Sequence, residues 1–230
     1  CNQQKNVLEK IIEYGDCWNF GLEVGSKSEL LIGLSILENQ KSLLICNGYK
    51  DKKYIETAIL ARKLGKHPII VIEQRDEVKR IIEAVKDLKA TPILGIRSKL
   101  SSKSSGRWGK SVGDNSKFGL SIPEIMQTIK ELKEANLINE MKLLHFHVGS
   151  QISDISVIKD ALQEASQIFV ELSKLGAPMK YIDVGGGLGI DFDGTKTSSN
   201  TSTNYSLQNY ANDVIATVKD SCEVNNIQHP

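Results

Sequence analysis

The chain has 230 residues, of which 40% are hydrophobic and 25% are charged. This composition is typical of a globular protein with one large core and excludes a disordered or fibrous chain. Lysine and arginine total 29 against 28 acidic residues, and a formal net charge of +1 gives no electrostatic footprint for nucleic acid or an anionic membrane. We therefore expect a small-molecule partner, with no nucleic acid and no membrane.

The cysteines and the ends of the chain indicate its cellular compartment and its completeness. Four cysteines lie far apart without a C-x-x-C pair, which favours a reducing compartment, and we expect the cytoplasm. No apolar run reaches the roughly 18 residues of a membrane span, and no secretion signal opens the chain. Because the chain begins at Cys1 without a methionine and stops at Pro230, we expect an internal fragment.

Short apolar runs alternate with amphipathic stretches of helical period along the whole chain. This alternation predicts repeated β-α units and a parallel sheet. The predicted strands are Trp18–Val24, Ser42–Cys46, Pro68–Ile72, Pro92–Ile96, Lys142–Val148 and Tyr181–Val184. Apolar stripes that begin at Val7, Val78 and Ile158 predict helices covering the sheet, and Gly15 and Gly176 end the first and third of these helices.

A series of β-α units is compatible with a doubly wound open sheet or with a closed eight-stranded barrel. Six visible strands plus one lost at each end would make eight, so we favour an incomplete (β/α)8 barrel, of the triosephosphate isomerase type, spanning residues 1–230. Two polar segments, Lys99–Ser116 and Asp193–Asn204, follow predicted strands. In a barrel they would lie on the active-site face, although solvated insertions are an equally good interpretation.

Three glycines, Gly185 to Gly187, directly follow the strand that ends at Val184. Glycines let a bound group approach the backbone N–H groups closely, which suits an anion such as phosphate. The pattern Gly185-x-Gly187-x-Gly189 places its third glycine one position too early for a dinucleotide fingerprint. A tight structural turn is the alternative interpretation.

Other strand ends carry polar residues. Alternation along the strand sends His145 and His147 to one face, and no further ligand at suitable spacing supports a metal. His147 could stack on a planar ligand while the Ser150 hydroxyl bonds a phosphate, although a structural role is the common one for such residues. Glu23 and Arg97 end two other strands, where catalytic groups of barrels collect. The spacing of Ser26 and Glu29 predicts a helix capping box instead.

Five segments in this order together resemble the pyridoxal-phosphate barrel of the ornithine, diaminopimelate and arginine decarboxylases. They are Cys1-Asn2-Gln3-Gln4, Glu23-Val24-Gly25-Ser26-Lys27-Ser28-Glu29, Phe118-Gly119, His147-Val148-Gly149-Ser150 and Asp183-Val184-Gly185-Gly186-Gly187. The resemblance covers nearly the whole chain. Within the family, the biosynthetic arginine decarboxylases are resembled most by three further segments: Ile45 to Asp51, Arg107-Trp108-Gly109 and Gly187 to Gly194.

The resemblance implies a function and a set of roles. It implies a carboxy-lyase that converts L-arginine to agmatine and CO2 in polyamine biosynthesis. The alternatives are an ornithine or diaminopimelate decarboxylase, a non-catalytic pyridoxal-phosphate barrel and a sugar-phosphate barrel. The Schiff-base lysine is expected just before Cys1, and a C-terminal β-domain after Pro230, so the fragment alone should be inactive. A homo-oligomer and a magnesium requirement are also implied by the resemblance, although no ligand cluster for magnesium is visible.

The same resemblance assigns individual residues. The implied catalytic residues are His147, stacked on the cofactor ring, and Glu23, beside the missing lysine. The implied cofactor-binding residues are His147, Ser150, Gly185, Gly186, Gly187 and Arg97. We expect the guanidinium of arginine to need acidic or planar acceptors, which gives the candidate substrate-binding residues Asp183, Gly187, Leu188, Gly189, Asp191 and Asp193.

Overall fold

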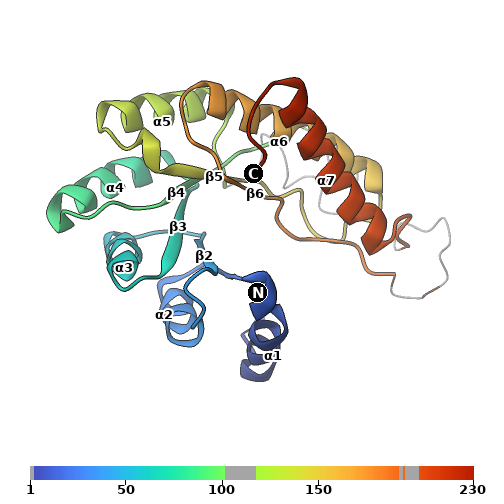
Figure 1. Ribbon diagram of the computed structural model, residues 1–230, viewed down its shortest axis with the longest axis horizontal. Helices are drawn as coiled ribbons and strands as arrows, with labels where there is room; N and C mark the ends of the chain where they lie inside the picture. The colour runs from blue at the N-terminus through green and yellow to red at the C-terminus, as the bar shows by residue number, and fades with distance from the viewer. Residues whose placement is uncertain (1–2, 102–117, 192–193, 195–201) are drawn as a thin grey trace.

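The computed structural model describes residues 3–101, 118–191, 194 and 202–230. Within them, six parallel strands form one sheet whose order follows the sequence. The strands are β1 (Leu22–Val24), β2 (Leu43–Cys46), β3 (His67–Ile72), β4 (Leu94–Arg97), β5 (Met141–His145) and β6 (Tyr181–Asp183). A doubly wound sheet reverses its strand order at one point, whereas a barrel does not. The fold is therefore the predicted incomplete barrel, with the helices following one another around the outside of the curved sheet (Figure 1).

Helices connect the strands, and all the described helices except α1 have a side-chain cap or capping box at their first turn. They are α1 (Lys5–Gly15), α2 (Lys27–Ile36), α3 (Lys52–Lys63), α4 (Arg75–Leu88), α5 (Ile122–Glu134), α6 (Ile155–Lys174) and α7 (Leu207–Val224), with the 3-10 turns η1 (Asp16–Trp18) and η4 (Ile138–Glu140). The Ser26 side chain accepts a hydrogen bond from the backbone N–H of Glu29, as the spacing predicted. The Glu29 carboxylate accepts from Gly25 N–H at 2.7 Å, one residue earlier than in a standard capping box.

The strands are apolar on both faces, which is typical of parallel sheets covered on both sides. On the outer face, Leu44, Ile70 and Leu144 join the core shared with the helices. On the inner face, Ile69, Val71 and Leu143 form a second, smaller cluster. This inner cluster lies in the barrel interior, below the carboxyl ends of the strands, which carry polar groups.

Most of the predicted strands were too long: Ser42–Cys46 and Pro92–Ile96 each exceed the observed strand by one residue, and three others differ for identifiable reasons. Trp18–Val24 shortens to β1 because Asp16–Trp18 forms η1 and Asn19 takes a left-handed φ of 55°. Lys142–Val148 ends at His145, and the last ladder bond beyond that strand runs from Phe146 N–H to the carbonyl of Asp183. The strand predicted as Tyr181–Val184 ends at Asp183 because the chain turns at Gly185 (φ 68°). Both strands therefore end where the glycine turn bends the chain out of the sheet.

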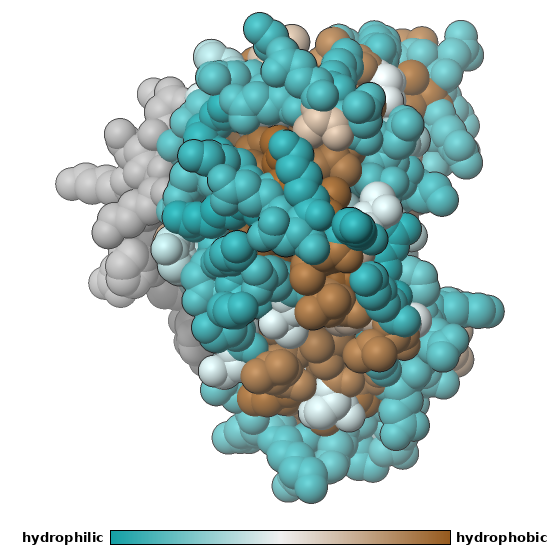
Figure 2. Space-filling view, turned by 90° about the vertical axis from the view of Figure 1, so that its left-hand side faces the viewer, coloured by the Kyte–Doolittle hydropathy of each residue, from teal (hydrophilic) through white to brown (hydrophobic). Residues whose placement is uncertain are grey.

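The prediction that the first helix covers the sheet was wrong. Although α1 has the expected apolar stripe, none of its residues is buried. It precedes β1, an edge strand, so the sheet offers it little surface to cover. Tyr14, Trp18 and Phe20 are exposed nearby. Figure 2 shows that hydrophobic side chains gather in the lower half of the face it presents, at the level of α1 to α3 in Figure 1.

Candidate functional site

Two loops at the carboxyl edge of the sheet cross each other, one following β5 and one following β6. The N–H of Ile152 donates to the carbonyl of Gly187 at 3.0 Å, and the N–H of Gly189 donates to the carbonyl of Ile152 at 3.0 Å. The Tyr205 hydroxyl donates to the same Ile152 carbonyl at 2.6 Å and accepts from Gly189 N–H at 3.0 Å. The segments that start at His147 and Gly185 therefore form one continuous rim.

The crossing leaves no room for side chains at two of the glycines. A Cβ on Gly187 would lie 1.8 Å from the carbonyl oxygen of Gly149, and a Cβ on Gly185 would lie 2.6 Å from that of Phe146. Both residues also have a positive φ, of 95° and 68° respectively. The glycine pattern is thus required by the close approach of two backbones. Gly186 differs, since a Cβ there would meet nothing within 4 Å.

The rim presents hydrogen-bond donors to the space above it. Within the described part of the chain, the backbone N–H groups of Gly186 and Gly187 have no hydrogen-bond acceptor. Ser150 is exposed, and its Cα would lie 3.2 Å from a Cβ on Gly187, so its hydroxyl belongs to the same rim. Free N–H groups of a glycine turn next to a hydroxyl suit a phosphate.

His147 follows β5 by two residues, and the structure separates it from His145. His145 is buried inside the barrel, whereas His147 lies beyond the strand and is exposed at the rim. The surrounding chain nonetheless desolvates the imidazole, and this, with the positive charge of Arg97 and the neighbouring His145, lowers the pKa of His147. Its usual value is about 6.5, so His147 is neutral at physiological pH.

The buried His145 pairs with the half-buried Asp183 on the next strand, with 3.0 Å between Nδ1 and Oδ2. The other carboxylate oxygen of Asp183 accepts from Gly185 N–H at 2.9 Å. Burial alone would raise the pKa of Asp183, but the hydrogen bond and charge of His145 and the Gly185 N–H outweigh it, so the pKa lies below its usual range. Asp183 thus remains ionised and ties the glycine turn to β5.

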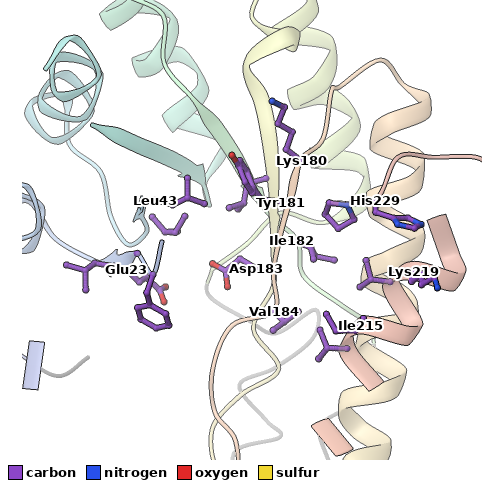
Figure 3. A pocket seen from close by; sticks show the side chains of 18 of the residues that line it. Glu23, Leu43, Lys180, Tyr181, Ile182, Asp183, Val184, Ile215, Lys219 and His229 are labelled. Atoms are coloured by element: carbon purple, nitrogen blue, oxygen red, sulfur yellow. The ribbon is translucent and has the colours of Figure 1, made fainter. Parts of the chain in front are cut away.

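Glu23 and Asp183 line one cavity, of about 880 Å³, between the two edge strands β1 and β6. Figure 3 shows their carboxylates on opposite walls of this cavity. The Glu23 carboxylate accepts a hydrogen bond from the Asn47 side chain, which follows β2. Arg97 is the last residue of β4 and acts electrostatically on His147. The structure therefore gathers the predicted residues of four strand ends at one edge of the sheet.

The remaining candidate residues follow the glycine turn. The side chain of Leu188 packs against the hydrophobic core, so only its backbone is left for a ligand. The N–H of Gly189 is taken by Ile152 and Tyr205. Asp191 accepts from Gly194 N–H at 3.2 Å, away from the cavity between the edge strands. Asp193, Arg107-Trp108-Gly109 and most of Lys99–Ser116 and Asp193–Asn204 lie outside the described residues.

Sequence reasoning missed three charged residues beneath the rim, Lys50, Glu73 and Glu77, all of which are buried. Glu73 directly follows β3, so its place after a strand, shared with Glu23 and Arg97, was a signal that could have found it. Among the residues that the structure describes, no three His, Cys, Asp or Glu side chains form a group that could hold a metal ion. Nor does any described helix have the length and apolar composition to cross a membrane.

Comparison with known proteins decides the family. Residues 1–229 match the pyridoxal binding domain of the pyridoxal-dependent decarboxylases. The chain belongs to this family. Its members use pyridoxal phosphate, and the residues at the rim fit that cofactor because the glycine turn, with its free N–H groups beside Ser150, can hold the phosphate.

Two relatives of high identity carry the same name. The chain is 97% identical over all its 230 residues to the biosynthetic arginine decarboxylase of Prochlorococcus marinus subsp. pastoris, and 65% identical to that of Parasynechococcus marenigrum. It spans 36% of the length of each of these proteins.

Solved structures agree with this fold. The biosynthetic arginine decarboxylase of Campylobacter jejuni superposes on the whole chain with a TM-score of 0.87 and 34% identity, and 36% of that chain is covered. A diaminopimelate decarboxylase of Helicobacter pylori, at 22% identity and a TM-score of 0.73, shares the fold over 92% of this chain and 51% of its own.

Proposed function

We propose that the complete protein decarboxylates L-arginine to agmatine and CO2 and that this chain supplies much of its cofactor site. The observation that carries the proposal is identity along the whole chain to relatives named biosynthetic arginine decarboxylase, from 34% in the solved structure to 97%. The domain covers about a third of such a protein, so the activity belongs to the complete molecule. Its product would enter polyamine biosynthesis.

The phosphate end of the cofactor is assigned to the rim. Gly185, Gly186 and Gly187 offer backbone N–H groups and the close approach that a side chain would prevent, while Ser150 adds a hydroxyl. These neutral donors act together on a dianion, and such charge-assisted hydrogen bonds are stronger than neutral ones. The phosphate thereby fixes one end of the ring.

The ring itself is assigned to His147, Arg97 and Glu23. The neutral imidazole of His147 can lie flat against an aromatic ring without adding a positive charge to it. Arg97 would offer guanidinium N–H groups to the phenolic oxygen of the ring. Glu23 lies across the cavity from Asp183, and we place the lysine that would hold the cofactor beside Glu23. When bound there, pyridoxal phosphate would supply an electron sink for the pair left on the substrate Cα as CO2 departs.

Substrate contacts are assigned to the segment that follows the glycine turn. A guanidinium needs carboxylates or carbonyl groups at the far end of the site. Asp191 and Asp193 supply such carboxylates after the glycine turn, while Gly187, Leu188 and Gly189 supply backbone groups. Asp183 lines the cavity, but both of its oxygens already have partners, so we assign it to holding the turn as well. We also propose a cytoplasmic homo-oligomer, supported by the resemblance to the family, with magnesium as a further requirement.

The experiment is a substrate comparison with the full-length protein. CO2 release and amine formation are measured with L-arginine, L-ornithine and diaminopimelate, and we expect agmatine to be the main product. Release of CO2 from ornithine or diaminopimelate but not from arginine would contradict the proposal. A His147→Gln variant should lose activity, whereas His67→Gln, at the opposite end of β3, is the matched control that should retain it.

A further inference from the structure

Four charged side chains, Lys50, Glu73, Glu77 and Arg97, meet at the rim, and the first three of them have no role in the site described above. Lys50, Glu73 and Glu77 are 0%, 2% and 0% exposed, and they lie next to Arg97. Lys50 Nζ lies 3.1 Å from Glu77 Oε1 and 3.6 Å from Glu73 Oε2. Arg97 Nη1 donates to Glu73 Oε1 at 2.5 Å. Two cations and two carboxylates thus form a chain in the order Glu77, Lys50, Glu73 and Arg97.

The buried end of this chain is fixed by the backbone. Lys50 Nζ also donates to the carbonyl of Gly48 at 2.6 Å, and Glu77 accepts from the N–H groups of Glu73 and Gln74 at 2.8 and 3.3 Å. Arg80 donates to the carbonyl of Lys50 at 3.0 Å. Hydrogen bonds to the backbone therefore fix Lys50 in the loop after β2 and Glu77 at the start of α4. Glu73, which lies beside Lys50, has little freedom to move.

Arg97 lies at the exposed end of the chain of charges. Glu73 contacts one guanidinium nitrogen, and the guanidinium carbon lies 5.9 Å from the centroid of the Phe118 ring. The backbone N–H of Gly119 donates to the carbonyl of Glu73 at 3.2 Å, so the loop that carries Phe118 is tied to the same residue. An arginine has five N–H donors, and in the described residues only Nη1 has a hydrogen-bond acceptor. The remaining donors are free for a ligand at the rim.

A stabilising role alone explains this arrangement poorly. Buried ion pairs cost desolvation energy, and apolar side chains of similar volume often stabilise a fold as well or better. Such a pair does fix the direction of a long side chain, which is what a cation at a binding site requires. Because Glu73 bridges Lys50 and Arg97, it sets where the guanidinium stands relative to His147 and the glycine turn.

We propose that Glu73, held in place by Lys50, is a positioning residue that directs the Arg97 guanidinium at the bound cofactor. The inference rests on the proposed function, since it takes pyridoxal phosphate as the ligand. It deepens that function by assigning a role to two buried residues that do not themselves touch the cofactor. Their effect passes through Arg97 alone.

A double-mutant cycle in the full-length protein tests this role. The dissociation constant for pyridoxal phosphate is measured by fluorescence quenching in the wild type, Glu73→Gln, Arg97→Met and the double variant. We expect each single change to weaken binding about tenfold, which is the size of a charge-assisted hydrogen bond. The double variant should bind no more weakly than Arg97→Met, because Glu73 acts through Arg97. Additive losses, or an unchanged constant in Glu73→Gln, would overturn the proposal.

Glu131→Gln is the matched control, because Glu131 also pairs with a guanidinium, that of Arg75, but on the outer helices α4 and α5. This variant should leave the dissociation constant unchanged. A tenfold loss of affinity in Glu131→Gln would overturn the proposal, because it would show a general effect of removing an ion pair. If Glu73→Gln does not fold, the double variant Lys50→Met/Glu73→Gln replaces it, because removing one cation and one carboxylate keeps the cluster neutral. This double variant should show the same tenfold loss of affinity. Wild-type affinity in the double variant would overturn the proposal. A wild type that binds no pyridoxal phosphate would instead contradict the proposed function.

Discussion

The imidazole Nδ1 of His145 lies 3.0 Å from the Oδ2 of Asp183, and this pair joins β5 to β6 where the glycine turn begins. The second oxygen of Asp183 accepts from Gly185 N–H at 2.9 Å. One carboxylate therefore connects a buried histidine of one strand to the backbone of the candidate phosphate loop. The position of that loop depends on the charge state and geometry of Asp183.

Asp183→Asn should loosen the glycine turn. An amide at this position cannot accept with both of its polar atoms, and a lost buried hydrogen bond costs about 1 to 3 kcal/mol. We expect faster hydrogen exchange in residues 181–189 of the full-length protein, measured by mass spectrometry. Asp213→Asn, which breaks the Lys159–Asp213 ion pair between α6 and α7, is the control that should leave this segment unchanged. Equal exchange in the wild type and Asp183→Asn would count against the role of the pair.

The stabilisation from Asp183 should also depend on pH. Because its pKa in the folded protein is below its usual value of about 3.9, its contribution is complete above that value and is lost as the pH falls through the folded pKa. Exchange in residues 181–189 of the wild type, corrected for the intrinsic rate, should therefore accelerate in this acidic window. Asp183→Asn should lack that step.

His147 should titrate below its usual pKa of about 6.5. Removal of a nearby cation in Arg97→Met should raise the pKa of His147, and removal of an anion in Glu23→Gln should lower it. The measurement is an NMR titration of histidine-labelled full-length protein without cofactor, with His147→Gln used to assign the resonance. A pKa above 6.5 in the wild type, or the opposite order of the variants, would show that the rim geometry is wrong.

Gly187→Ala and Gly186→Ala should differ sharply in stability. The Cβ at residue 187 would collide with the carbonyl of Gly149 and would sit on a backbone with φ of 95°, whereas the Cβ at residue 186 enters open space. Steric overlap and a strained φ together cost about 3 kcal/mol or more, and the change at Gly186 should cost about 1 kcal/mol or less. Thermal unfolding of the full-length variants provides the comparison. Similar melting temperatures would mean that the two loops do not cross as described.

The Tyr205 hydroxyl should contribute to phosphate binding although it lies behind the rim. It bridges Ile152 and Gly189 at the crossing of the two loops. Tyr205→Phe removes this single oxygen, and we expect the affinity for pyridoxal phosphate to fall about fivefold, since a net hydrogen bond contributes about 1 kcal/mol. Tyr210→Phe is the control, because Tyr210 packs near Gly186 and its hydroxyl has no hydrogen bond within the described chain. Equal loss in both variants would attribute the effect to packing.

Much of the site could be located from the sequence because strand ends are marked by local patterns. The triplet Gly185 to Gly187 after an apolar run, and the polar residues Glu23, Arg97 and His147 after three others, indicated one edge of a barrel. The extent of the strands could not be predicted in the same way. Val148 continues the apolar alternation of β5, yet the strand stops earlier because its neighbour β6 turns away at Gly185.

The sequence by itself determined the β-α order, the capping of the first turns and the family, since each depends on residues close together in the chain. Only the tertiary structure decided which distant residues meet. It pairs His145 with Asp183, places a carbonyl of the β5 loop where a side chain on Gly187 would stand, and buries Lys50 and Glu73 beneath Arg97. The physical reason is that these contacts join loops and strands far apart in the chain, from 24 residues for Glu73 and Arg97 to 38 for His145 and Asp183, and their approach depends on the register and curvature of the whole sheet.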